Sequence, residues 1–260
     1  MIVLGYFLAL FVGILLGLIG GGGSILTVPI LVYIMGVSPV SATAYSLFIV
    51  GISALVGAHR FFKNGHVNFR ISLFFGIPSL IGVFLCRKWI VPSLPESFSF
   101  FHILTINKDS FILIVFALVM LIASFPMLFS WKMPERKQNN KPFLIAVDGI
   151  LVGIITGFVG AGGGFLIIPA LLLLTNISMK EAVGTSLLII AIKSILGFTA
   201  ELGNPIDWNL LMLFTASSIL GIFIGTYFSN IINGSILKKS FGIFVFVMAI
   251  IIFLKEIVFI

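Results

Sequence analysis

The first 59 residues of this chain contain no Asp, Glu, Lys or Arg, and the first charged side chain is that of Arg60. An α-helix rises about 1.5 Å per residue, so a helical path of about 58 residues would cross a hydrocarbon core of about 30 Å roughly three times. Over the whole chain, 60% of the residues are hydrophobic, 9% are charged and the mean hydropathy is +1.28. Soluble globular domains do not reach these values, so the sequence predicts an all-α polytopic membrane protein.

Apolar segments follow one another along the chain in two sets of five. The first set covers about 2–19, 24–36, 39–58, 71–91 and 110–131. The second set covers about 143–160, 164–175, 180–200, 208–230 and 238–259. About eight segments are long enough to cross the membrane, whereas 24–36 and 164–175 are too short and are expected to be broken or re-entrant helices. The polar linker 132–142 separates a first transmembrane repeat, 1–131, from a second, 143–260.

An internal repeat relates the two sets. A glycine-rich run at 20–24 recurs 140 positions later at 160–164, and each run is followed five residues on by a proline. Further matches at this spacing, or at 139 positions after one residue drops out, are Ser38 with Ser178, Ser46 with Ser186, Asn68 with Asp207, and Gly82 with Gly221. Any two apolar segments look somewhat alike, but agreement at polar and glycine positions favours a duplication.

The charges of the connections predict how the two copies face. Connections 59–70, 132–141 and 230–240 are net basic, whereas 201–209 contains two acids and no base. Because basic connections stay in the cytoplasm, the third segment is followed by a cytoplasmic loop in the first copy and an external loop in the second. We therefore expect inverted repeats in the inner (cytoplasmic) membrane, with a cytoplasmic linker and both termini external.

The glycine runs are the first candidates for a binding site. Glycine is a poor helix former, and a helix break at membrane depth survives only where it is packed in protein or lines a watery cavity. Amides that open a helix after glycine can contact an oxyanion without obstruction by Cβ. The candidates are Gly20, Gly21, Gly22, Gly23, Ser24, Gly160, Gly162, Gly163 and Gly164. The alternative is that glycines permit close helix packing, which is the interpretation preferred for Gly17 and Gly157.

Polar side chains inside the third segments are further candidates. Ser46, Thr185 and Ser186 lie early in those segments, where a hydroxyl donates either to an oxyanion or to a backbone carbonyl one turn earlier. Lys193 is the only basic residue well inside a predicted segment. A charge within the membrane costs about 2.5 to 3.5 kcal/mol and therefore suggests a function, so we expect Lys193 to bind the anion. It lies two turns after Ser186 on nearly the same face. The alternatives are that Lys193 reaches the membrane surface or pairs with Glu201.

Several of these motifs together resemble one known family. They are the glycine run followed by an apolar stretch with proline, the sequence Ala-Val-Gly-Thr-Ser-Leu at 182–187, and Gly-His-Val-Asn at 65–68. In this combination the chain resembles, over essentially its whole length, the sulfite exporter TauE/SafE family of membrane permeases. The resemblance implies transport of sulfite, an organosulfonate or a related small anion. The first copy has Tyr45 where the second has Thr185, so the two halves of a site would differ chemically.

Other classes of protein find little support in the sequence. It has no HExxH, no Walker-type lysine, no paired cysteines and no nucleophile elbow, so we expect neither an enzyme nor a cofactor or metal site. The single cysteine, Cys86, cannot form a disulfide within the chain. The net charge of +7 does not indicate nucleic-acid binding, because the basic residues lie in short connections between apolar segments.

Two alternative functions stay open, namely a non-transporting membrane scaffold or regulatory subunit, and a channel or permease for another small anion. The lipid bilayer is an expected partner of either. His59, His66, His102 and Asp148 near segment ends make H+ a candidate coupling ion, although surface positions or structural pairing also account for them. The sequence specifies neither the direction of transport nor the oligomeric state.

Overall fold

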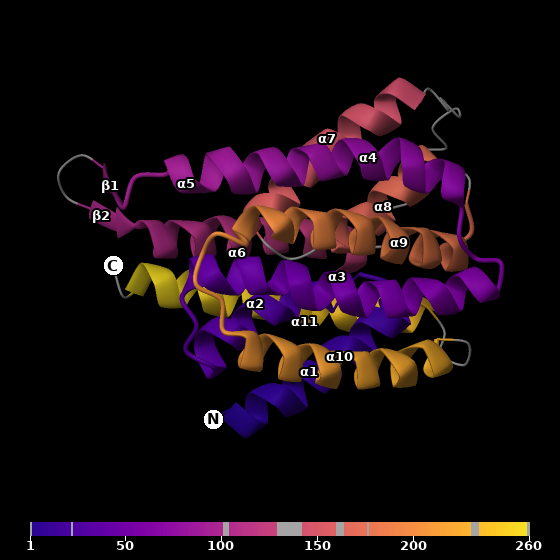
Figure 1. The fold of residues 1–260 in the computed structure, drawn as a ribbon, viewed down its shortest axis with the longest axis horizontal. Helices are drawn as coiled ribbons and strands as arrows, with labels where there is room; N and C mark the ends of the chain where they lie inside the picture. Colours follow the sequence, from indigo (N-terminus) through magenta and orange to yellow (C-terminus); the bar gives the residue numbers. More distant parts are fainter. Residues whose placement is uncertain are drawn as a thin grey trace.

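The computed structural model describes residues 2–21, 23–100, 104–128, 142–159, 164–175, 177–229 and 234–258. The helices of the first part are α1 (Ile2–Ile19), α2 (Ser24–Pro29), η1 (Ile30–Ile34), α3 (Pro39–Lys63), α4 (Phe69–Leu85), η2 (Cys86–Ile90), α5 (Val91–Ser93) and α6 (Lys108–Leu128). Those of the second part are α7 (Pro142–Val159), α8 (Gly164–Leu174), α9 (Met179–Phe198), η3 (Thr199–Glu201), α10 (Trp208–Phe228) and α11 (Gly234–Val258). The long helices lie side by side in one bundle (Figure 1).

The helices begin and end close to the predicted segments. Within the described ranges, five helical stretches are long and apolar enough to cross a membrane, namely Pro39–Lys63, Phe69–Ser93, Lys108–Phe125, Lys180–Glu201 and Trp208–Phe228. Shorter apolar helices cover Val3–Ile19, Ile25–Ile34 and Phe143–Val159. The chain is therefore a helical membrane protein, as predicted, and the number of about eight full-length spans stays a prediction.

A short β-ribbon was not predicted. Strands β1 (Ser97–Phe100) and β2 (Leu104–Asn107) pair antiparallel where an irregular linker was expected. The Ser-Phe-Ser-Phe sequence of β1 alternates between polar and apolar residues with the period of a strand. Phe98 packs against Phe111 of α6, with their ring centroids 4.5 Å apart. The ribbon is thus attached to the start of α6.

Four of the long helices start at side-chain caps. Ser38 and Ser178 begin α3 and α9, and Asn68 and Asp207 begin α4 and α10. In each case the capping oxygen accepts a hydrogen bond from the amide three residues later, which satisfies a donor that the helix leaves unpaired. Ser38 and Ser178 lie 140 positions apart, and Asn68 and Asp207 lie 139 positions apart. The similarity between the halves therefore includes the residues that cap helices.

Small residues bring two pairs of helices into close contact. A Cβ on Gly13 of α1 would overlap the carbonyl of Ser218 in α10, and a Cβ on Gly153 of α7 would overlap the carbonyl of Ser79 in α4. One turn later, a Cβ on Gly157 would lie 2.9 Å from Cα of Val83. Glycine is required at these positions because backbone, rather than a movable side chain, occupies the space. Close packing is therefore the role of Gly157.

Gly17 has the same role on the other pair of helices. A Cβ on Gly17 would lie 2.6 Å from the amide nitrogen of Thr226 in α10. The contacts of α1 with α10 thus correspond to those of α7 with α4, at positions related by the sequence repeat.

The ends of the helices define two faces of the bundle. Gly5 of α1 lies against Met35, which follows η1, because a Cβ on Gly5 would be 2.7 Å from Cγ of Met35. Thus α1 and α2 with η1 form a hairpin whose turn is the first glycine run. We call the face with Gly5, Met35 and Glu201 the terminal face, and both chain ends lie toward it in Figure 1. The opposite, linker face holds the 64–68 loop, where a Cβ on Gly184 at the start of α9 would overlap the carbonyl of His66.

Candidate functional site

The two glycine runs meet inside the bundle. A Cβ built on Gly21 would overlap Cα of Gly164, and one built on Gly164 would overlap Cα of Gly21. Ile190 of α9 adjoins this contact, because its Cδ1 would lie 2.5 Å from a Cβ on Gly164. The first run ends where α2 starts, and Gly164 is the first residue of α8. Two helix breaks 140 positions apart in the sequence are thus neighbours in space.

Some of the predicted residues are not covered by the structure. Gly22, Gly160, Gly162 and Gly163 lie outside the described residues, and so does the side chain of Ser24. Their proposed contacts with an anion stay predictions. The described part of the two runs is Gly20, Gly21, Gly23 and Gly164.

The first run packs against the beginning of α9. Gly20 adopts a φ of 78°, which an L side chain rarely occupies, and a Cβ there would lie 2.7 Å from Cγ1 of Val183. Ser186 donates a hydrogen bond of 2.8 Å to the carbonyl of Val183, and its Oγ is also 3.4 Å from the carbonyl oxygen of Gly20. Gly23 packs closely on α1. Ser186 therefore lies beside the glycine run with its proton directed to backbone carbonyls, and its contact with an anion stays a prediction.

Thr185 occupies a structural position. Its Oγ1 accepts a hydrogen bond of 2.9 Å from the amide of Asn68, the residue that caps α4. The corresponding Tyr45 accepts a bond of 2.7 Å through Oη from the amide of Asp207, the residue that caps α10. A threonine and a tyrosine thus hold equivalent helix starts, which reduces the chemical difference expected between the halves at this position.

Ser46 differs from both of these hydroxyls. It is fully buried, and its Oγ has no hydrogen-bond partner within the described part of the chain. The same holds for Thr27 of α2, Ser79 of α4 and Ser194 of α9. A buried hydroxyl without a partner is costly, because it gives up its hydrogen bonds to water. Of the three predicted hydroxyls, Ser46 is therefore the one whose hydrogen-bonding capacity is unused.

Lys193 is completely buried in α9. Its Nζ donates a hydrogen bond of 2.9 Å to Oγ1 of Thr156, the residue just before the second glycine-rich stretch, and no ion pair to it is found among the described residues. The alternative that Lys193 reaches the surface or pairs with Glu201 is wrong, because the side chain is enclosed and Glu201 pairs with Arg87. A lysine ammonium has three donors, so two stay available to a ligand.

Arg87 was not predicted as a site residue. It lies in η2 at the end of α4, is 2% exposed and approaches Glu201 with Nη1 3.5 Å from Oε1. Lys193 is therefore not the only buried base in the membrane segments. The position of Arg87 within the predicted segment 71–91 was a signal that the sequence contained, but its pairing with Glu201 joins residues far apart in the chain.

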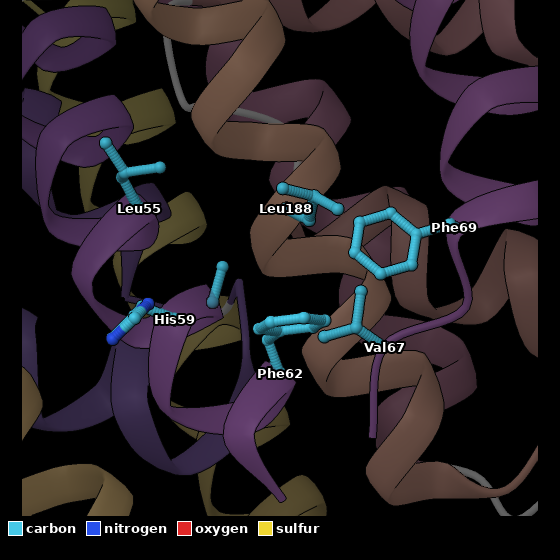
Figure 2. A pocket seen from close by; sticks show the side chains of 7 residues that line it. Leu55, His59, Phe62, Val67, Phe69 and Leu188 are labelled. Atoms are coloured by element: carbon cyan, nitrogen blue, oxygen red, sulfur yellow. The ribbon is translucent and has the colours of Figure 1, made fainter. Parts of the chain in front are cut away.

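Two cavities open on the two faces of the bundle. Figure 2 shows an apolar one of about 180 Å³ near the linker face, lined by Leu55, Ala58, His59, Phe62, Val67, Phe69 and Leu188. A polar one of about 460 Å³ at the terminal face is lined by Val40, Glu96, Asn107, Lys108 and Asp109. Neither is lined by a predicted anion-binding residue, and His59, a candidate for proton coupling, lines the apolar one. In the described ranges, no cluster of His, Cys, Asp and Glu has the composition of a metal site.

Comparison with known proteins gives a consistent set of relatives. The sequence model of the family described as sulfite exporter TauE/SafE matches residues 6–252. A probable membrane transporter protein of Xylella fastidiosa (strain Temecula1) is 30% identical, over 92% of this chain and 90% of its own length. The probable membrane transporter protein YdhB of Bacillus subtilis (strain 168) is 26% identical, over 88% of this chain and 90% of its own length. No solved structure matches the chain.

Proposed function

Because the chain belongs to the sulfite exporter TauE/SafE family, we propose that it carries a small sulfur-containing oxyanion, such as sulfite or an organosulfonate, between the two glycine breaks. The protein is a membrane transporter and not an enzyme. The solute and the binding residues are the parts that we propose.

The burial of Lys193 is the observation that carries this proposal. Its ammonium makes one hydrogen bond, to Thr156, and has no carboxylate partner in the described part of the chain. A buried charge without a counterion is strongly disfavoured, so an anion is the natural complement of this side chain. A sulfite or sulfonate oxygen would accept the two remaining ammonium donors.

The surroundings of Lys193 support a site near the middle of the bundle. Lys193 contacts Thr156 next to the second glycine-rich stretch, whereas Ser186, seven residues earlier, contacts the first run at Gly20. Seven residues are about 10 Å of helix, so one face of α9 lies along both breaks. Backbone amides of the breaks and the unused hydroxyl of Ser46 are further donors for an oxyanion.

We further propose that the two halves, 1–131 and 143–260, are inverted repeats. The correspondence of the helix caps, and of the close contacts of α1 with α10 and of α7 with α4, supports this proposal. The opposite directions of α3 and α9, which end at opposite faces of the bundle (Figure 1), also support it. In transporters of this architecture, broken helices of the two repeats form the binding site at midplane.

The charges favour an orientation in the inner (cytoplasmic) membrane with the linker face inside and both termini outside. The connections 59–70 and 132–141 contain more basic than acidic residues. The connection 201–209, at the terminal face, contains Glu201 and Asp207 and no basic residue. Single cysteines at 63 and 203, placed in a Cys86→Ala background, are expected to react with an impermeant reagent from opposite sides. Reaction of both from one side would contradict the inverted arrangement.

Flux measurements test the proposed function. Purified protein in sealed vesicles with an imposed anion gradient is expected to take up radiolabelled sulfite or ethanesulfonate saturably, and a pH gradient tests H+ as the coupling ion. Uptake of chloride or nitrate alone would favour a permease or channel for another small anion. No uptake of any anion by folded protein would favour a scaffold or regulatory subunit.

A further inference from the structure

Arg87 has an exceptional environment for a buried arginine. The residue is 2% exposed, and Nε, Nη1 and Nη2 all lack a hydrogen-bond partner within the described residues. Its nearest acidic neighbour there is Glu201, with Nη1 3.5 Å from Oε1, longer than a charge-assisted hydrogen bond of about 2.7 to 2.9 Å. Guanidinium offers five donors in a planar fork, so Arg87 has a large unused capacity for binding an oxyanion.

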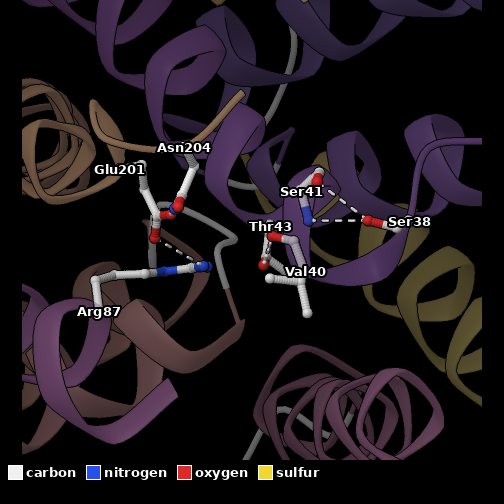
Figure 3. A network of polar contacts seen from close by, with 7 residues as sticks. All are labelled: Ser38, Val40, Ser41, Thr43, Arg87, Glu201 and Asn204. Carbon is white, nitrogen blue, oxygen red and sulfur yellow. Dashed lines mark hydrogen bonds and ion pairs between the residues drawn. The ribbon is translucent and has the colours of Figure 1, made fainter. Parts of the chain in front are cut away.

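Glu201 is not held mainly by Arg87. Its Oε2 accepts a hydrogen bond of 2.9 Å from Nδ2 of Asn204, and its carbonyl accepts one of 2.9 Å from the amide of the same residue. These bonds anchor the carboxylate to its own connection between η3 and α10. Figure 3 shows Glu201 between Asn204 and Arg87, with a single ion-pair contact to the arginine. A carboxylate held in this way can lose its contact with Arg87 without losing its own support.

The local backbone is also unusual at Arg87. Directly after α4, residues Cys86–Ile90 form the π-helix η2. π-helical turns are rare in proteins overall, and those that occur are often found at functional sites. In Figure 3 the guanidinium points toward the first turn of α3, where Val40 and Thr43 lie. Val40 also lines the polar cavity of about 460 Å³ at the terminal face. The polar cavity and the guanidinium of Arg87 therefore both lie near the beginning of α3.

Arg60, near the other face, is the natural comparison. Its Nη1 donates to Oγ1 of Thr226 at 2.6 Å and to the carbonyl of Phe223 at 3.0 Å, and its guanidinium lies 5.3 Å from the Phe223 ring centroid. Thr226 is the residue that corresponds to Arg87 at the repeat spacing of 139 positions. One arginine thus joins two helices through hydrogen bonds, whereas Arg87 is buried without any.

We propose that Arg87 binds the transported oxyanion at the terminal face, where the anion replaces Glu201 as the partner of the guanidinium. This inference rests on the proposed function and adds a second subsite to it. Glu201 follows Lys193 by eight residues, or about 12 Å along the helix, so the two subsites are separate. The ligand must be a small anion with at least two oxygens, since only such a group matches the guanidinium fork. Glu201 keeps the arginine paired when no anion is bound.

The test compares the initial rate of radiolabelled sulfite uptake as a function of concentration in three variants. Arg87→Gln is expected to raise KM about tenfold, equal to about 1.4 kcal/mol. Glu201→Gln is expected to lower KM severalfold, because the competing carboxylate loses its charge. Arg60→Gln is the matched control, and its KM is expected to equal that of the wild type.

The sign of the Glu201→Gln effect separates binding from a structural ion pair. If Arg87 and Glu201 only stabilise the fold, both variants lower the melting temperature and Glu201→Gln leaves KM unchanged or raises it, which would overturn the inference. Should Arg87→Gln not fold, the double variant Arg87→Gln/Glu201→Gln avoids an unpaired buried carboxylate and is expected to show the same raised KM. Saturable wild-type flux with unchanged KM in these variants would reject the subsite alone, whereas absence of wild-type flux would reject the proposed function.

Discussion

Two equivalent buried positions, Ser53 in α3 and Lys193 in α9, show how the halves of this protein differ. Ser53 donates a hydrogen bond of 3.0 Å to Oγ of Ser218 in α10, and both residues are fully buried. In the second half, Lys193 instead contacts Thr156 in α7, and Ser79, the counterpart of Ser218, has no hydrogen-bond partner among the described residues. The position of Ser53 is therefore uncharged and its hydroxyl is hydrogen-bonded, whereas the position of Lys193 contains a charge and lies in the half where the hydroxyl of Ser79 is unused.

At this pair of positions, therefore, the second half supplies a charge and the first half supplies a neutral pair of hydroxyls. A neutral pair of hydroxyls contributes to stability without attracting a solute. A lysine at the same place costs free energy on insertion, about 2.5 to 3.5 kcal/mol, and this cost is explained if an anion binds there. At Tyr45 and Thr185 the side chains differ but the role is the same, because each accepts a hydrogen bond from the amide of a residue that caps a helix.

The largest expected effect comes from removing the charge of Lys193. Lys193→Gln should reduce sulfite flux about hundredfold, because a hydrogen bond to a charged group contributes roughly 1.5 to 3 kcal/mol. Lys193→Arg should retain part of the flux, and Ser53→Ala, the matched change in the other half, should retain nearly all of it. Initial uptake rates in vesicles of equal protein content measure this. Equal losses in Lys193→Gln and Ser53→Ala would remove the distinction between the halves.

A smaller effect is expected where the glycine breaks meet. Gly21→Ala places a methyl group against the backbone of Gly164, which has no side chain that can move away, so we expect flux to fall at least about tenfold as the backbones separate. Gly76→Ala is the control, since its Cβ would lie at an ordinary 3.6 Å from Cγ1 of Ile189. Uptake and elution volume on gel filtration report transport and folding. Wild-type flux in Gly21→Ala would show that the contact of the breaks is not needed.

The smallest effect concerns the two hydroxyls that hold helix starts. Tyr45→Phe and Thr185→Val each remove a hydroxyl that accepts a hydrogen bond from the amide of a residue capping a helix. Each should lower the free energy of unfolding by about 1 kcal/mol, while KM for sulfite stays unchanged. Thermal unfolding of purified protein and concentration-dependent uptake measure the two quantities. A raised KM in Thr185→Val alone would restore Thr185 as a binding residue.

Much of the fold could be read from the sequence because local signals determine it. Pro39 after Ser38 starts α3, the capping box of Ser178 and Glu181 starts α9, and the glycines after Ile19 end α1. These signals act within a few residues of the helix end, so the predicted and observed bounds agree closely. The strand β1 was missed because four residues of alternating pattern are a weak signal beside long apolar segments.

The contacts of the site were harder to predict because they join distant parts of the chain. A hydroxyl inside a helix can bond to its own backbone, another helix or a solute, and the sequence does not distinguish these partners. Thr185 therefore looked like Ser46, although one is bonded to Asn68 and the other has no partner in the described residues. For Lys193, burial followed from its place in the segment, but its contact with Thr156 depends on how α7 packs beside α9.

Equilibrium binding of radiolabelled sulfite to purified protein tests the central claim most directly, because it does not depend on vesicle orientation or coupling. The account predicts saturable binding to the wild type and at least about tenfold weaker binding to a folded Lys193→Gln variant, a difference of about 1.4 kcal/mol. Equal affinity of the two proteins would contradict the claim that the buried ammonium of Lys193 binds the transported anion.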